Sequence, residues 1–363
     1  MPKLDRPAFT HRLLLLGYLG GRNLGDDAML IALLRRLPSD REVVVLARDP
    51  SQVRLPDDVL CAVVLERAGL WSAVRRILWA DTVVRVGGTS FHDEYTSSRR
   101  TALNYTRLCG LYALSRFLRR RVIHLGIGVG TVTRRSTRVL LGLATKSASL
   151  IVTRDVLSAE RLARYRSPKH LTGVDLVMVS YPPLRHERRG TAKGVALSVV
   201  DLAPFDSGVD SDQYWWTLAE SLVSRFPDRQ LYVLAFKDNE RESDVPPAQR
   251  LVDRLNRAGI AATLVSYDQG LEAFLAVFEN CDVAVATRYH SLVFALHYSC
   301  DAYVVPYNSK LRALAADVGL PESRMIPTDA AEVRDWTPES WEPKMPRDFD
   351  ARLAALDAVV GSL

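Results

Sequence analysis

Short apolar runs alternate along the chain with amphipathic stretches, and this alternation is typical of strands and helices that build a parallel β-sheet. In the first half, the expected strands are rich in Val, Leu and Ile. They cover residues 12–17, 42–47, 82–86, 122–126 and 150–153. Residues 28–37 and 103–118 have helical spacing and lie between these strands. The pattern therefore predicts a series of βαβ units.

The pattern changes over residues 181–193, which are rich in proline and charged residues and lack a periodic apolar pattern, so we expect an interdomain linker there. Further strands are expected at 194–200, 231–236, 262–265, 282–286 and 302–306, with helices at 214–226, 247–258 and 272–279. These boundaries predict an α/β protein with two Rossmann-like domains, 1–185 and 194–335, facing a cleft. Residues 336–363 form a tail with a closing helix over 350–360.

The composition fits this picture. The chain has 363 residues, of which 48% are hydrophobic and 25% charged, so we expect a globular protein rather than a disordered one. Its formal charge is +6, and Arg greatly outnumbers Lys. Arg binds carboxylates and phosphates through two parallel hydrogen bonds, so anionic ligands are one explanation, and a general codon preference is the simpler one.

The four cysteines are scattered, which predicts neither a zinc site nor a redox pair and fits a reducing cytoplasm. Glycines interrupt the apolar run near the N-terminus, so it reads as a strand rather than a signal peptide. We find no apolar stretch long enough for a membrane helix.

A first candidate site follows the first strand, in the sequence GYLGGRNLGDDAML from Gly17 to Leu30. Its glycines match neither a dinucleotide fingerprint nor a P-loop. Asp26 and Asp27 would repel a phosphate, but they suit sugar hydroxyls or a general base. The alternative is that one Asp caps the following helix.

Two further loops follow strand ends. The sequence VGGTSFHDEYTSS, from Val86 to Ser98, offers His92 and Asp93 as an acid–base pair, or else forms an ordinary surface loop. The sequence LGIGVG reads by itself as a tight turn. Arg154 ends another strand, where it could hold a carboxylate or phosphate, or pair with the neighbouring Asp155.

The most informative segment is VAVATRYHSLVFAL, which begins at Val283. Arg288 and His290 stand between a buried strand and an apolar helix, where a doubly wound sheet places its ligand. A cation and a titratable group at a helix N-terminus suit anion binding and proton donation. Lys310 follows the next strand and could add a phosphate contact, or be a solvated helix lysine.

Basic clusters surround the aromatic, leucine-rich segment 105–118. They comprise Arg116, Arg119, Arg120, Arg121, Arg134, Arg135 and Arg138. A solvated basic face is the simpler interpretation, and a helix resting on an anionic membrane is the alternative. Nucleic-acid binding is not expected, because no recognised module is present.

Taken in order, these motifs resemble the polysaccharide pyruvyl transferase family. The resemblance also includes GVDL from Gly173 and PYNSKLRALAADVGL from Pro306, so it spans about residues 13–320. The chain departs from the family pattern at Thr89, Thr131 and Tyr289, whereas Arg288 and His290 are retained. The family is similar in fold to the GT-B glycosyltransferases, and the resemblance implies transfer of pyruvate from phosphoenolpyruvate to two sugar hydroxyls as a cyclic ketal.

This resemblance implies roles for individual residues. His290 would act as the general acid, and Asp26 or Asp27 would activate the acceptor. The donor side would be bound by Arg288, His290, Arg154, Lys310 and Tyr289, and the acceptor side by Asn23, Gly21, Asp93 and Ser90. Residues 1–185 would carry the acceptor side and residues 194–335 the donor site, with Arg154 reaching the donor across the cleft.

The expected partners are phosphoenolpyruvate and a saccharide acceptor, with a lipid-linked acceptor and peripheral membrane contact left open. No cofactor and no metal are expected. A glycosyltransferase that uses a nucleotide sugar is the runner-up, and a catalytically silent sugar-binding subunit is a third interpretation.

Overall fold

A computed structural model gives the structure of the chain, and it describes residues 10–93, 98–164, 170–180, 193–205, 208–240, 242–337, 339–342 and 344–363. Most of the expected linker, residues 181–192, lies outside this description. The described chain forms two compact units. Unit 1 takes its residues from 1–21, 26–180 and 348–363, and unit 2 takes its residues from 22–25 and 181–347.

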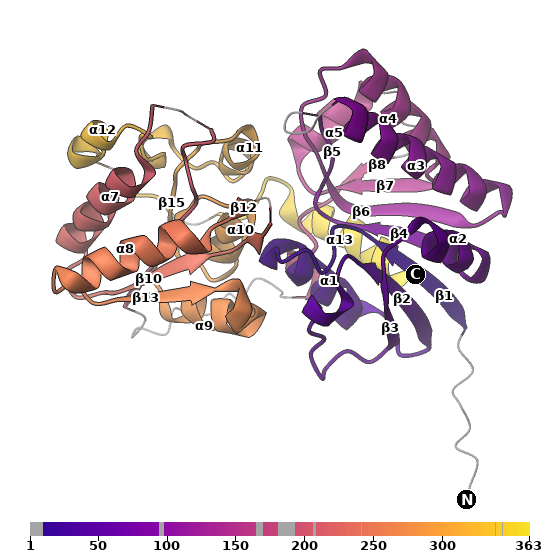
Figure 1. Cartoon of the computed structure of the whole chain (residues 1–363), viewed down its shortest axis with the longest axis horizontal. Coiled ribbons are helices and arrows are strands. Elements are labelled where there is room, and N and C mark those ends of the chain that lie inside the picture. The colour runs from indigo at the N-terminus through magenta and orange to yellow at the C-terminus, as the bar shows by residue number, and fades with distance from the viewer. Residues whose placement is uncertain are drawn as a thin grey trace, which may run out of the picture. The chain divides into compact units, whose positions relative to one another are not determined.

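Unit 1 is built on a parallel sheet with the strand order β3-β2-β1-β4-β6-β7-β8, and the short strand β5 also pairs with β6 (Figure 1). Its strands are β1 (His11–Leu16), β2 (Arg41–Ala47), β3 (Ala62–Arg67), β4 (Thr82–Val86), β5 (Thr89–Phe91), β6 (Arg121–Val129), β7 (Leu150–Thr153) and β8 (His170–Thr172). Strands β1, β4 and β6 lie inside the sheet, and their apolar side chains are almost completely buried.

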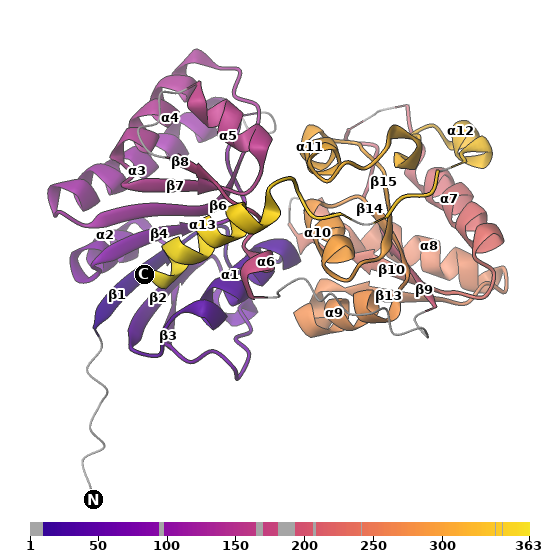
Figure 2. The ribbon, with the colours of Figure 1, turned by 180° about the vertical axis from the view of Figure 1, so that it is seen from behind.

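Helices cover both faces of this sheet. Its helices are α1 (Leu24–Arg36), α2 (Leu70–Trp79), α3 (Ser98–Phe117), α4 (Arg135–Ser147), α5 (Val156–Ala163), α6 (Val177–Ser180) and α13 (Phe349–Gly361). Helix α3 packs against both α2 and α4, and the three share one hydrophobic core with the sheet. Figure 2 shows α13 crossing the opposite face of the sheet. Buried side chains such as Ile77, Tyr112 and Leu141 fix the inward faces of α2, α3 and α4.

Unit 2 contains a five-stranded parallel sheet in the order β13-β10-β9-β14-β15. Its strands are β9 (Gly194–Ser198), β10 (Gln230–Ala235), β13 (Ala262–Ser266), β14 (Val283–Ala286) and β15 (Asp301–Val304), together with the hairpin β11 (Asp238–Asn239) and β12 (Glu242–Ser243). Its helices are α7 (Ser211–Arg225), α8 (Val245–Arg257), α9 (Leu271–Asn280), α10 (Tyr289–His297), α11 (Ser309–Asp317) and α12 (Ala330–Asp335).

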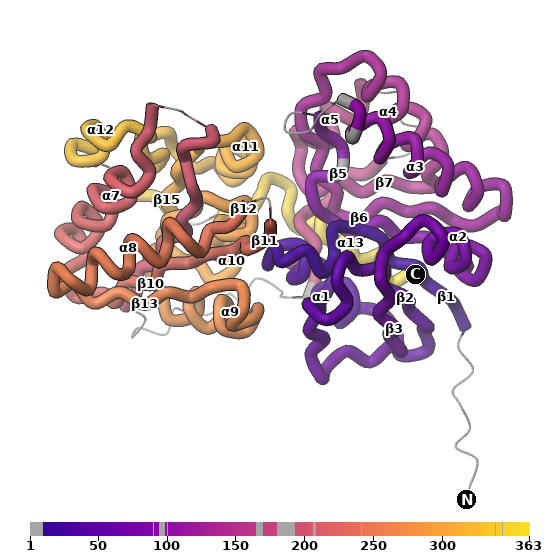
Figure 3. Tube along the Cα trace, viewed as in Figure 1, coloured from indigo at the N-terminus to yellow at the C-terminus, as the bar shows by residue number. Residues whose placement is uncertain are grey.

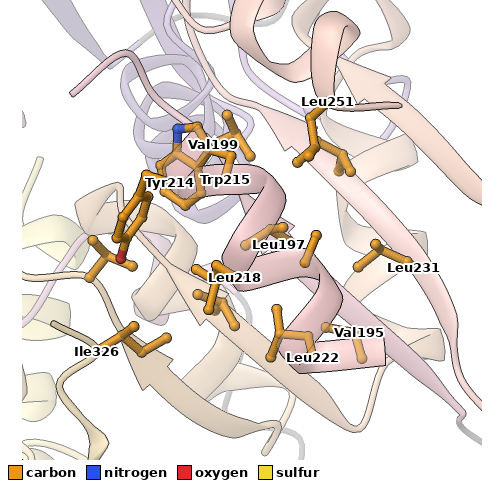
Figure 4. Close-up of a cluster of buried hydrophobic side chains, with 14 of the residues drawn as sticks. Val195, Leu197, Val199, Tyr214, Trp215, Leu218, Leu222, Leu231, Leu251 and Ile326 are labelled. Carbon is orange, nitrogen blue, oxygen red and sulfur yellow. The ribbon is translucent and has the colours of Figure 1, made fainter. Parts of the chain in front are cut away.

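A large apolar core holds α7 against the sheet of unit 2. Figure 4 shows Tyr214, Trp215, Leu218 and Leu222 of α7 among side chains from β9 and β10. Trp215 is completely buried, and its indole N–H donates to the carbonyl of Val200 at 2.7 Å, so its one polar atom is satisfied.

All ten strands expected from the apolar runs are present, and none of their ends is shifted by more than three residues. The strands β3, β5 and β8 and the hairpin β11–β12 were not expected. Strand β3 lies at the sheet edge and is only partly buried, so it lacks the dense apolar pattern of its neighbours. The others are three residues long or shorter, too short to show a period.

Two short segments pack with the unit that is remote from them in sequence. Residues 22–25 belong to unit 2, where the Leu24 N–H donates to the carbonyl of Phe236 at 3.0 Å. The expected tail 336–363 divides, because residues from Asp348 onward pack on unit 1. There the buried guanidinium of Arg352 donates to the carbonyl of Gly173 at 2.8 Å. Within the described ranges, no helix is both long and apolar enough to cross a bilayer.

Candidate functional site

The Arg-Tyr-His segment of unit 2 lies at the carboxyl end of the central strand β14, where it begins helix α10. β14 is enclosed between β9 and β15, and the hydroxyl of Thr287, which follows β14, shares a 2.8 Å hydrogen bond with the hydroxyl of Ser198 at the end of β9. The Ser291 hydroxyl accepts from the Arg288 N–H at 3.1 Å and so closes the first turn of the helix. Local hydrogen bonds therefore hold Arg288 and His290 at a rigid strand-to-helix junction.

Arg288 is already engaged by two carboxylates. Its guanidinium pairs with Asp244, and it lies 2.6 Å from Glu242. The Tyr307 hydroxyl lies 3.3 Å from the same guanidinium. The two carboxylates come from the hairpin that follows β10 (Figure 3) and from the residue that precedes α8.

Burial dominates the electrostatics of this group. It raises the pKa of Asp244 above its ordinary value, although the positive charge of Arg288 acts in the opposite direction. Burial also opposes the charge of Arg288, but Tyr307 and Asp244 outweigh it and raise the pKa of the guanidinium. The sequence predicted that Arg288 binds an anion. A donor anion at Arg288 would instead compete with Asp244 and Glu242.

His290 lies against residues 22–25, the N-terminal segment that belongs to unit 2. A β-carbon built on Gly25 would fall 2.5 Å from Cγ of the His290 ring and closer still to Nδ1. The imidazole is only 8% exposed, and Tyr289 meets it edge-on at 5.6 Å between ring centroids. The glycine at position 25 therefore makes room for His290.

The segment 22–25 is fixed by polar contacts within unit 2. Arg22 pairs with Asp238 of the hairpin and lies 2.8 Å from Asp268. Asn23 forms an antiparallel bridge with Lys237. Asn23, expected on the acceptor side, thus belongs to the same unit as His290.

Lys310 lies in the first turn of α11, where the preceding Asn308 caps the helix by accepting from the Leu311 N–H at 3.0 Å. α10 and α11 each begin just after one of the neighbouring strands β14 and β15. Since these strands are parallel, Lys310 and Arg288 stand at the same edge of the unit 2 sheet.

In unit 1, Gly87 and Gly88 of the VGGTSFHDEYTSS loop make room for helix α1. A β-carbon on Gly88 would fall 2.9 Å from a carboxylate oxygen of Asp26, and one on Gly87 would fall 2.6 Å from Cε of Met29. Asp27 accepts from the Gly20 N–H at 3.3 Å, so it stabilises the turn that contains Gly21. Both carboxylates are almost buried in this turn.

Arg154 lies over the LGIGVG segment. A β-carbon on Gly128 would fall 2.9 Å from both Nε and Nη2 of Arg154, so the guanidinium lies directly on that glycine. It also donates to the Thr89 hydroxyl at 3.3 Å and lies 3.5 Å from Asp155. Its side chain is only 4% exposed, so the salt bridge considered from the sequence is present and the guanidinium is largely shielded from solvent.

The geometry of Asp93 does not fit the expected acid–base pair or an acceptor pocket. Its side chain is 1% exposed, and its carboxylate accepts from the amides of Thr133 and Arg134, both at 2.9 Å. Burial alone would raise the pKa of Asp93, but these hydrogen bonds outweigh it and lower the pKa. Asp93 therefore anchors the turn before α4. Ser90 lies in β5, and its side chain is outside the described set.

Sequence reasoning missed Asp244 and Glu242, which are the direct partners of Arg288. The available signal was the dense run of charges KDNERESD immediately after a strand. Because this run follows a strand, its charged side chains are candidates for the carboxyl ends of the strands, where ligands bind. Which of them pair with Arg288 depends on the fold. Among the described residues, no group of His, Cys, Asp and Glu side chains is arranged to hold a metal ion.

Known structures share this architecture. UDP-GlcNAc 2-epimerase from Methanocaldococcus jannaschii is 11% identical with a TM-score of 0.59, and the match covers 96% of this chain and 99% of that one. A putative UDP-N-acetylglucosamine 2-epimerase from Listeria monocytogenes is 13% identical with a TM-score of 0.56, covering 96% and 95%. These likenesses show a GT-B-type fold.

The sequence itself gives the family. The model for polysaccharide pyruvyl transferases matches residues 23–309, a range that begins at Asn23 and includes the Arg288–His290 segment. The match covers well over half of the chain and runs through both units. The chain belongs to the polysaccharide pyruvyl transferase family and is a transferase.

Proposed function

We propose that this transferase moves pyruvate from phosphoenolpyruvate to two hydroxyls of a saccharide, forming a cyclic ketal and releasing phosphate. One observation carries the proposal. Arg288 and His290 are held together at the N-terminus of α10, and the backbone of Gly25 packs on the His290 ring. A cation and a titratable imidazole at one strand end suit a substrate that is anionic and needs protonation at carbon.

The proposed reaction begins with proton transfer from His290 to the methylene carbon of phosphoenolpyruvate, which makes C2 electrophilic. One acceptor hydroxyl then adds to C2 and loses its proton. Cleavage of the bond between C2 and the phosphate oxygen releases phosphate, and the second hydroxyl closes the ketal. The proton that the first hydroxyl loses to Asp26 or Asp27 balances the one that His290 gave to the new methyl group, so its return restores His290. The proton of the second hydroxyl leaves with the phosphate.

We assign the donor to unit 2. Arg288 would bind its carboxylate or phosphate after exchanging part of its contact with Asp244 or Glu242, and Lys310 at the same sheet edge would supply a second cation. Tyr289 would line the donor site beside His290. Arg154 is proposed as a further donor-binding cation, whose use requires release of its contact with Thr89.

We assign activation of the acceptor to Asp26 or Asp27, with Asn23, Gly21 and Ser90 as acceptor-binding residues. The two carboxylates lie in the first turn of α1, and Asp26 lies against Gly88 of the VGGTSFHDEYTSS loop. We infer an acceptor from a cell-envelope polysaccharide or its precursor. The four free cysteines support a reducing, cytoplasmic location for the enzyme.

Ligand-dependent melting tests the donor assignment without knowledge of the acceptor. Phosphoenolpyruvate at about 100 times its Kd should add about 2.7 kcal/mol of stability to the wild-type protein. Arg288→Lys should lose this shift. His290→Gln should keep it but release no phosphate once an acceptor is found, because Gln cannot donate the proton.

Arg229→Lys is the matched control, since Arg229 also pairs with a carboxylate of unit 2, Asp282 at 2.7 Å, but belongs to none of the motifs. This variant should keep both the melting shift and phosphate release. A shift with nucleotide sugars alone would support glycosyl transfer instead. Full phosphate release by His290→Gln would remove the general-acid role.

A further inference from the structure

The outward surface of α2, α3 and α4 combines exposed apolar side chains with positive charge. None of the three helices contains Asp or Glu. Its exposed apolar side chains include Trp71, Leu103, Phe117 and Leu143. The cations exposed beside them are Arg107, Arg116, Arg135 and Lys146. We name these eight residues the apolar–basic face.

The apolar members are not needed for the core of unit 1. Each helix already buries its opposite side, through Ile77 of α2, Tyr112 of α3 and Leu141 of α4. By contrast, Trp71 and Phe117 are each 84% exposed. Large aromatic side chains held in water on neighbouring helices mark an interaction surface.

The cations of this face have no acidic partner among the residues that the structure describes. Carboxylates close to the three helices have other partners. Glu66 pairs with Arg75 and Arg76 of α2, and Asp81 lies 3.7 Å from Arg120. Asp93 accepts from the amides of Thr133 and Arg134 before α4. The positive charge of these four side chains is therefore available to an external partner.

We propose that the apolar–basic face binds the surface of a bilayer that contains anionic lipids. Trp and Phe side chains favour the boundary between headgroups and acyl chains, and nearby Arg and Lys side chains attract lipid phosphates. The simpler expectation from the sequence, a solvated basic face, does not account for the exposed Trp71 and Phe117. This inference does not depend on the pyruvyl-transfer reaction.

Charge distinguishes the bilayer from other occupants. A second copy bound face to face would bring the same unpaired cations of both copies together, and their repulsion opposes such a dimer. An anionic polysaccharide would satisfy the cations but would leave Trp71 and Phe117 in water. A bilayer surface matches both the charge and the apolar side chains.

Co-sedimentation with vesicles tests the proposal on the full-length protein. Wild type should bind vesicles of phosphatidylcholine with about one third phosphatidylglycerol, and should release them at high salt. The double variant Arg107→Gln/Arg116→Gln should bind roughly 30-fold more weakly, since each cation near the surface contributes about fivefold. The double variant Trp71→Ser/Phe117→Ser should bind the vesicles at least about tenfold more weakly, because it no longer buries two aromatic side chains in the bilayer.

Two controls lie outside the apolar–basic face. Leu60→Ser removes a side chain that is 71% exposed, and Arg257→Gln removes an exposed cation of unit 2. Both should bind vesicles like wild type, and all variants should keep the wild-type melting temperature within a few degrees. Wild type that stays in the supernatant with anionic vesicles at low salt would overturn the proposal. So would vesicle binding that both double variants retain, or a dimer in sedimentation velocity that Trp71→Ser/Phe117→Ser dissociates.

Discussion

Gly25 and His290 are 265 residues apart in the sequence, yet the imidazole of His290 lies directly on the α-carbon of Gly25. A side chain at position 25 would occupy the space of the ring, since its β-carbon would fall 2.5 Å from Cγ. This contact joins the first glycine-rich motif to the Arg-Tyr-His motif within unit 2. It explains why a glycine can be required inside the first turn of a helix, where it otherwise costs stability.

Gly25→Ala should displace the His290 ring and reduce the proposed pyruvyl transfer about 100-fold, because a misplacement of about 1 Å can cost this much when the displaced group takes part in the reaction. The rate of phosphate release from phosphoenolpyruvate, compared between the variant and wild type, measures this loss. Gly110→Ala is the control, as a β-carbon at this helical position meets nothing within 4 Å. Wild-type activity in Gly25→Ala would show that the position of His290 does not matter for transfer.

Asp244→Asn should destabilise unit 2 by about 3 kcal/mol, because it leaves the buried charge of Arg288 without its main partner. Urea unfolding monitored by fluorescence measures the loss. Asp212→Asn breaks the exposed pair between Asp212 and Arg250 and should cost about 1 kcal/mol or less. Equal effects of the two substitutions would contradict the importance of burial at Arg288.

His124 predicts a dependence of stability on pH. Burial beside Phe91 and Tyr112, with Arg85 opposite on β4, lowers the pKa of His124 to about 3. Unfolding returns the pKa to about 6.5, so the unfolded chain binds more protons between pH 6.5 and 3 and stability falls as the pH drops through this window. Between pH 7 and pH 5 the contribution is about 2 kcal/mol.

The variant His124→Phe should remove this part of the pH dependence, which unfolding free energies at pH 7 and pH 5 would reveal. His170→Gln provides a histidine control in the same unit, and its pH dependence should match that of wild type. If His124→Phe and wild type lose equal stability between the two pH values, His124 does not carry the effect.

Asp93→Ala should lower the stability of unit 1 by about 1–3 kcal/mol, since it orphans the amides of Thr133 and Arg134. Transfer activity per folded molecule should stay within about threefold of wild type, because the carboxylate faces this turn. Thermal unfolding and initial rates measure the two effects separately. A stable but inactive variant would restore Asp93 to the acceptor site.

The strand pattern and the order of the motifs were readable from the sequence by itself. Dense apolar runs such as β4 and β14 are buried inside the sheets, so their local composition reports their environment directly. The strand-end positions of Arg154 and Arg288 follow from the same pattern, because a charged residue ends each apolar run. Edge and very short strands such as β3 and β8 carry too little burial to leave this signal.

Only the tertiary structure decided what these side chains touch. Arg288 is paired because the hairpin after β10 brings Glu242 and the adjacent Asp244 to it, and Gly25 contacts His290 because residues 22–25 join unit 2. Likewise, Trp71 and Phe117 are left exposed once other residues of α2 and α3 fill the core. Each outcome depends on contacts between segments far apart in the chain, and local composition does not encode which partners meet. The sequence therefore determined the strands and motif positions, and the fold decided which charges are paired and which side chains face water.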